Sequence, residues 1–95
     1  MGDSVRVFSP VAHERIAEVH LARRPASLAG LRPGILENRK ANARALMEAL
    51  IEGLRARVPL GPLTVVGKPV AGPPSPSVVR TLREHCDFVL VGSCD

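Results

Sequence analysis

The most constraining feature of this 95-residue chain is the order of its apolar segments. Three short runs rich in Val, Ile and Leu, at residues 34–36, 63–66 and 88–91, are separated by two stretches with helical spacing. Short apolar runs suit strands buried on both faces, and strands that alternate with helices pair in parallel through right-handed crossovers. The sequence therefore predicts an α/β fold with a short parallel sheet in β-α-β-α-β order and flanking helices, the N-terminal half of a doubly wound (flavodoxin-like or Rossmann-like) domain.

The stretch between the first two apolar runs has the pattern of an amphipathic helix. Its apolar residues recur at steps of three and four and form a single stripe, which consists of Ala43, Leu46, Met47, Leu50, Ile51, Leu54 and Val58. Asn38 is suited to the N-cap, with Asn42 as the alternative, and Pro59 closes the helix. We expect the stripe to pack against the sheet.

A second, shorter helix is predicted before the third apolar run. Residues 70–76 contain three prolines in four positions and form a loop, because proline cannot continue a strand ladder. Ser75 is suited to cap the helix that begins at Pro76, since proline at the first helical position loses no needed N–H. The helix ends near His85, and Cys86 on its apolar stripe is interpreted as a buried structural thiol.

Residues 1–26 are predicted to form an N-terminal arm, separate from an α/β domain over residues 27–95. Val5 and Val7 alternate with polar residues in the manner of a short edge strand, which Ser9-Pro10 ends. Residues 13–20 have the composition of one or two helical turns or of an extended segment. We expect the arm to pack over the sheet.

Composition excludes several classes of function. The chain has no long uncharged apolar run for a membrane span, and its first residues lack the pattern of a secretory signal. With two Phe and no Tyr or Trp it lacks the stacking platforms of a single-strand nucleic-acid binder, so its net charge of +4 is interpreted as a solvated basic surface, with an anionic partner as the alternative. We therefore expect a cytoplasmic protein with no nucleic-acid or membrane partner.

Common cofactor and metal motifs are absent from the sequence. Cys86 and Cys94 fit neither a CxxC redox pair nor a zinc site, and the three histidines do not group at a metal-ligand spacing. No GxGxxG, Walker loop or GxSxG elbow is present. We expect neither a metal nor a cofactor.

Polar residues follow each predicted strand. In parallel sheets, ligands bind beyond the carboxyl ends of the strands, where these side chains would gather. Cys94 is either a nucleophile with a nearby cation or a small residue in a loop. Lys68 is either an anion ligand or an exposed loop lysine. Asn38 is either a helix cap or a substrate contact. The candidate binding residues are Glu37, Asn38, Lys40 and Lys68, and the candidate catalytic residues are Cys94 and Asp95.

Several of these segments resemble one known family in their order. The run SLAGLRPGILENRKAN at 27–42, Lys68-Pro69, the Pro-rich loop and the run CDFVLVGSCD at 86–95 follow the order found in the UGSC family of selenoproteins and their cysteine-containing relatives. That family has a "SLAGKRVGLLDNTKPN"-like opening and a "CDAVVxGxGD" segment directly before a selenocysteine-Gly-Ser-Cys signature. The resemblance covers about residues 27–95.

The resemblance implies a specific position for the chemistry. It matches Gly92 to the first glycine of the family segment and Asp95 to the aspartate directly before the selenocysteine, which makes Cys94 a neighbour of the nucleophile. On this basis we expect the reading frame to continue through a UGA codon after Asp95. The chain as given is then a truncated form with no activity of its own.

Two functions follow from these observations. The first is a selenol- or thiol-dependent redox or group-transfer protein of the UGSC type that acts on an unknown small molecule. The alternative is a non-enzymatic α/β binding module for a small anion or a partner subunit. An incomplete sheet also has an open edge, through which we expect a homo-oligomer or a second subunit to bind.

Overall fold

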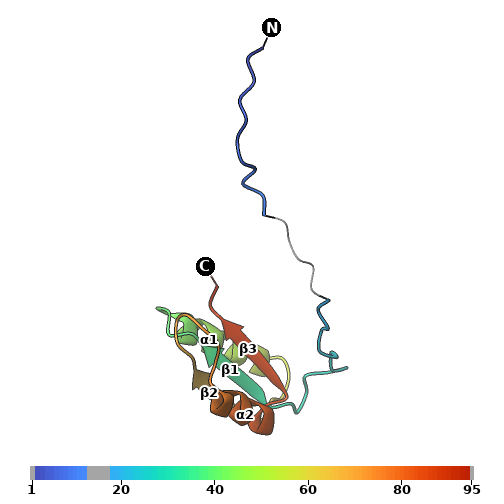
Figure 1. The fold of residues 1–95 in the computed structure, drawn as a ribbon. Coiled ribbons are helices and arrows are strands. Elements are labelled where there is room, and N and C mark those ends of the chain that lie inside the picture. The colour runs from blue at the N-terminus through green and yellow to red at the C-terminus, as the bar shows by residue number, and fades with distance from the viewer. Residues whose placement is uncertain (1, 13–17, 95) are drawn as a thin grey trace.

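In the computed structural model, which describes residues 2–12 and 18–94, three parallel strands form one sheet in the order β2-β1-β3 (Figure 1). The α/β class and the predicted order of elements are confirmed. The central strand is the first in sequence, so both of its neighbours arrive through crossovers. The strands are β1 (Pro33–Glu37), β2 (Thr64–Gly67) and β3 (Phe88–Gly92), and the helices are α1 (Ala43–Arg55) and α2 (Pro76–His85).

The hydrophobic core lies between the central strand and α1. Ile35 and Ile51 are fully buried, and Ala43 and Met47 complete the cluster. Ile35 aligns with Val65 on one side and with Leu90 on the other, so these three side chains share the face that α1 covers. A small core of this kind gives a domain little stability to spare.

The stripe predicted for α1 is wider than the surface that it buries. Leu46 and Leu50 belong to the stripe but are 56% and 52% exposed. α1 packs against β1 and β3, and within the described residues no further element lies beyond β3 to cover this side of the helix. The helix begins at Ala43, so the alternative candidate Asn42 rather than Asn38 occupies the N-cap position, with φ of 63° and no capping hydrogen bond from its side chain. The helix ends at Arg55, before Pro59.

The second helix agrees with its sequence signals. The Ser75 hydroxyl accepts a hydrogen bond from the Val78 N–H at 3.3 Å, and Pro76 is the first helical residue. α2 packs against β2 and ends at His85, with Cys86 as its C-cap. Cys86 is half-buried beside β1, where a Cβ atom placed on Gly34 would lie 2.6 Å from the Cys86 Sγ atom. This side of Gly34 is opposite to the side on which Ile35 meets α1, so the two helices lie on opposite faces of the sheet.

An ion pair ties the amino ends of β1 and β3 together. The Asp87 carboxylate accepts hydrogen bonds from the Arg32 backbone N–H at 2.8 Å, from Nε at 3.1 Å and from a terminal guanidinium nitrogen at 3.2 Å. The Asp87 N–H in turn donates to the Arg32 carbonyl at 2.8 Å. The charged and backbone hydrogen bonds from Arg32 hold the pKa of Asp87 below its usual value of 3.8.

We expect Asp87→Asn to remove a pH-dependent part of the folding stability. Because folding lowers the pKa of Asp87, its carboxylate stabilises the fold above the unfolded-state value of 3.8, and this contribution is lost as the pH falls through the lower folded-state pKa. Urea unfolding of both proteins from about pH 6 down to about pH 2 should give two curves that differ at neutral pH and converge in acid. Asp3→Asn in the exposed arm is the control, and a constant difference between the Asp87→Asn and parent curves would contradict the prediction.

The arm differs from its predicted form. Residues 2–12 contain no strand, and Val5, Val7 and Phe8 are almost fully exposed. The arm extends away from the sheet rather than packing over it, and the molecule is 69 Å long but only 30 and 28 Å across (Figure 1). A strand requires a partner for its backbone hydrogen bonds, and the arm has none within the described chain. The helical turns expected at 13–20 fall mainly on residues 13–17, which lie outside the described residues.

Candidate functional site

The three strands end at the same edge of the sheet. Glu37 aligns with Gly67 on β2 and with Gly92 on β3, so the chain leaves all three strands at one level. We call this edge the carboxyl rim, and it comprises the residues Glu37, Asn38, Arg39, Lys40, Gly67, Lys68, Gly92, Ser93 and Cys94. All the predicted site residues except Asp95, which lies outside the described residues, belong to it.

Asn38 joins the ends of β1 and β3. Its Nδ2 donates to the Ser93 carbonyl at 2.7 Å, and its Oδ1 accepts from the Ser93 N–H at 3.1 Å. The Asn38 backbone N–H donates to the Gly92 carbonyl at 3.0 Å and continues the ladder. The prediction that Asn38 caps α1 is therefore wrong: the N-cap residue is Asn42, and the Asn38 amide is hydrogen-bonded to the residue that follows β3. The side chain fixes the backbone that delivers Cys94.

Glu37 lies over the end of β2. Its carboxylate accepts a hydrogen bond from the Arg39 N–H at 2.6 Å, and a Cβ atom on Gly67 would lie 2.8 Å from its Oε1 atom. The Glu37 carbonyl accepts from the Lys68 N–H at 2.9 Å. Glycine at position 67 thus leaves room for the Glu37 carboxylate, which is held in place by its hydrogen bond from the Arg39 N–H.

The loop after β1 has an uncommon backbone. Arg39 and Asn42 have φ of 62° and 63°, in the left-handed region that residues other than glycine adopt only rarely. The tight turn at Glu37–Arg39 and the start of α1 together hold this conformation. The sequence gives no cue for the first of these two conformations, because an arginine is not a typical left-handed residue.

Three cations accompany one carboxylate at the carboxyl rim. Arg39 and Lys40 follow β1 and Lys68 follows β2, with Glu37 as the acidic residue among them. The Lys68 ammonium donates to the Pro69 carbonyl at 2.8 Å. The described residues of the rim thus carry a net positive formal charge, which favours an anionic ligand nearby.

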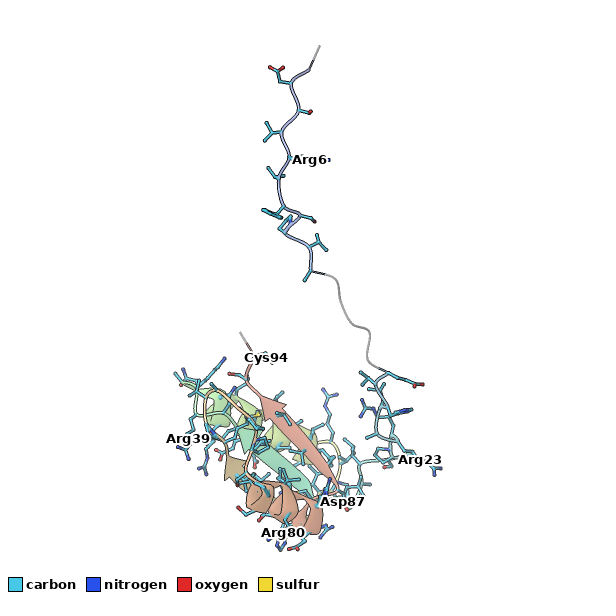
Figure 2. The ribbon with its side chains drawn as sticks, viewed as in Figure 1. Arg6, Arg23, Arg39, Arg80, Asp87 and Cys94 are labelled. Atoms are coloured by element: carbon cyan, nitrogen blue, oxygen red, sulfur yellow. The ribbon has the colours of Figure 1, made fainter. Side chains whose placement is uncertain are left out.

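Cys94 is an exposed thiol at the carboxyl rim. It follows Ser93 beyond the end of β3, while Asp87 lies at the other end of the same strand (Figure 2). Cys86 also lies at that other end, so the length of β3 separates the two sulfurs and excludes a disulfide between them. Among residues 2–12 and 18–94, no group of three His, Cys, Asp or Glu side chains is placed to hold a metal ion.

Two surface hollows lie away from the rim. A shallow one of about 500 Å³ is lined by Leu31, Asp87 and the Arg23–Ala26 segment at the base of the arm. An apolar groove of about 390 Å³ runs between α1 and β3. Neither of these two hollows includes a residue of the rim. Its distinguishing features are the ordered strand ends and the exposed thiol.

The hydrogen-bonded pairs that join the ends of β1 and β3 were not predicted from the sequence. Asn38 with Ser93, and Arg32 with Asp87, are pairs separated by 55 residues in sequence. No periodicity connects positions so far apart. The signal that was available is the alignment of strands, since pairing β1 with β3 in one register brings both pairs together.

Comparison with known protein families gives a match that covers most of the chain. The UGSC family model matches residues 6–95, which includes most of the arm as well as the sheet. No curated protein matches the chain, and no solved structure matches it. In the described part of the chain, neither helix has the length and apolar character needed to cross a membrane. Because the match extends over nearly the whole chain, this protein belongs to the UGSC family.

Proposed function

We propose that the carboxyl rim carries thiol- or selenol-dependent redox chemistry on small-molecule disulfides. The observation that supports this most strongly is the position of Cys94. Its thiol is exposed directly after Ser93, whose backbone is held by both atoms of the Asn38 amide. Parallel sheets bind their ligands beyond the carboxyl ends of the strands, where this thiol lies. A reduced thiol of this kind suits a cytoplasmic protein.

The reaction that we propose is thiol–disulfide exchange. A thiolate attacks one sulfur of the disulfide, a new S–S bond forms, and the other sulfur leaves as a thiolate that takes a proton from water. A second protein thiol then attacks the mixed disulfide and releases the remaining half as a thiol. The protein pair is oxidised to a disulfide, and the small molecule is reduced to two thiols.

The family resemblance supplies the second reactive group. In UGSC proteins the selenocysteine-Gly-Ser-Cys signature follows the aspartate that corresponds to Asp95. The proposal therefore assigns the main nucleophile to the position after Asp95 and gives Cys94 the role of an additional thiol beside it. Asn38 is a positioning residue, since it holds the backbone from which these groups extend.

The test compares the chain ending at Asp95 with one extended by Cys-Gly-Ser-Cys. An aromatic disulfide that releases a coloured thiolate is used without added reductant to count the reactive thiols, and turnover is followed with an aliphatic disulfide and reduced glutathione, whose slow direct exchange is measured without protein and subtracted. We expect the shorter chain to release one equivalent rapidly from Cys94 and a second slowly from half-buried Cys86, and the extended chain to turn over. Cys94→Ser should remove the rapid phase, and Cys86→Ser only the slow one.

The role of Asn38 is tested in the extended chain. Asn38→Ala removes both hydrogen bonds to Ser93, so we expect the turnover rate to fall by about tenfold while the circular dichroism spectrum is kept. Cys86→Ser is the matched control and should leave turnover unchanged. Absence of turnover in the folded, extended chain would overturn the proposed function. Unchanged turnover in Asn38→Ala would overturn the positioning role alone.

The alternative function is the binding of a small anion. The observation that favours it is the excess of cations at the rim, where Arg39, Lys40 and Lys68 accompany only Glu37. Titration with inorganic phosphate, followed by NMR shifts of the backbone amides, distinguishes the two functions. Shifts confined to residues 38–40 and 68, together with no turnover of the disulfide, would favour the binding module.

A further inference from the structure

Within residues 2–12 and 18–94, no strand pairs with the outer edge of β3. β3 pairs with β1 on one side only, since the sheet order is β2-β1-β3. The Phe88 N–H and the Gly92 carbonyl both bond toward β1. Because backbone groups alternate along a strand, those of Val89 and Val91 point away from β1. An edge with free donors and acceptors of this kind accepts an added strand.

Apolar surface flanks this edge on both faces of the sheet. On the face covered by α1 lies the groove between α1 and β3, whose walls include Leu50, Gly53 and Leu90. On the other face Val91, which aligns with Leu36, is 67% exposed. A strand added here would therefore bury apolar side chains on both of its own faces.

The arm of the same chain contains a segment with this pattern. In an extended Ser4–Phe8 segment, Val5 and Val7 share one face and Phe8 lies on the other. All three side chains are almost fully exposed in the extended arm (Figure 2, near Arg6). Ser9-Pro10 ends the segment, since proline cannot continue a strand ladder. The UGSC match begins at residue 6, so Arg6, Val7 and Phe8 of this segment lie within the matched region.

We propose that residues 4–8 of a second copy of this chain pair with the outer edge of β3. Two copies exchange their arms reciprocally, so that each edge receives one strand and the dimer closes with two-fold symmetry. The arm leads away from its own sheet, which favours the second copy as the partner (Figure 1). Residues 9–26 can extend by about 3.3 Å each, or roughly 60 Å, which exceeds the 30 Å width of the molecule.

The experiment is sedimentation equilibrium of the full chain over a concentration series, with one variant on each side of the contact. Val91→Lys places a charge at the receiving edge, and Val7→Lys places one in the donated strand. Each should raise the dimer Kd by about tenfold or more, because a buried valine is replaced by a lysine that must stay solvated. Val70→Lys, at a valine that is 57% exposed in the loop after β2, and Val11→Lys are the matched controls and should leave Kd unchanged. Circular dichroism confirms that each variant is folded.

A mixing experiment distinguishes exchange between copies from folding of the arm onto its own sheet. Val7→Lys keeps a competent edge and Val91→Lys keeps a competent arm, so an equimolar mixture should form heterodimers with one intact contact, more tightly than either variant alone. A chain that stays monomeric throughout the series overturns the proposal. A dimer whose Kd is unchanged in both Val7→Lys and Val91→Lys overturns it as well, and so does a dimer that the two control variants weaken equally. A mixture that associates no more tightly than either variant alone also overturns it.

Discussion

Ile51→Ala is expected to remove about half of the folding stability of this protein. Ile51 is fully buried in the cluster with Ile35, Ala43 and Met47, and its truncation leaves a cavity between α1 and the sheet. Replacing a buried isoleucine by alanine costs about 2–5 kcal/mol. An α/β body of this size has a free energy of unfolding of only about 3–10 kcal/mol, so the loss is a large fraction of it.

The matched control for Ile51→Ala is on the same helix. Leu46 belongs to the same sequence stripe but is 56% exposed, so Leu46→Ala should cost less than about 1 kcal/mol. Urea unfolding followed by circular dichroism at low protein concentration measures both variants. Equal losses in the two would mean that α1 does not use the Ile51 face as its contact with the sheet.

Gly34→Ala has the second largest expected effect. The added methyl group would lie 2.6 Å from the Cys86 Sγ atom and 3.1 Å from a Val89 methyl carbon, in the middle of the central strand. Such overpacking costs about 1–3 kcal/mol, because the strand cannot shift without breaking its pairing on both sides. We therefore expect a clear drop in the free energy of unfolding from a single methyl group.

Two further variants make this prediction specific. In a Cys86→Ala background the closest contact is gone, so Gly34→Ala should cost at least about 1 kcal/mol less than in the parent, as a double-mutant cycle would show. Gly53→Ala is the same substitution in α1, where nothing lies within 4 Å of the added atom, and it should stabilise the protein by about 0.5–1 kcal/mol. Additive losses at positions 34 and 86 would contradict the contact.

Much of the fold could be predicted from local patterns. The strands and α2 follow from apolar runs, from Ser75-Pro76 and from the proline-rich loop, since these signals act within a few residues. The exposure of Leu46 and Leu50 could not be predicted in this way. Helical spacing shows which residues share a face of α1, but the width of the buried part depends on what covers β3.

The arm shows the limit of pattern reasoning most clearly. Val5 and Val7 have the alternation of a strand, yet a strand forms only where another backbone accepts its hydrogen bonds. The candidate site shows the same limit. The general rule for parallel sheets indicated the strand ends, but the two-bond contact of Asn38 with Ser93 depends on the register between β1 and β3.

The position of β1 in the sheet has a consequence for how the chain acquires its structure during synthesis. β1 is made first, yet its partners follow later, and its pairing with β3 joins residues 55 apart. Contacts at such separations are slow to form because a long loop must close before they contribute. Residues up to Ser93 must therefore have left the ribosome before β1 has both of its neighbouring strands. Until then the apolar residues of β1 are exposed and can be bound by chaperones.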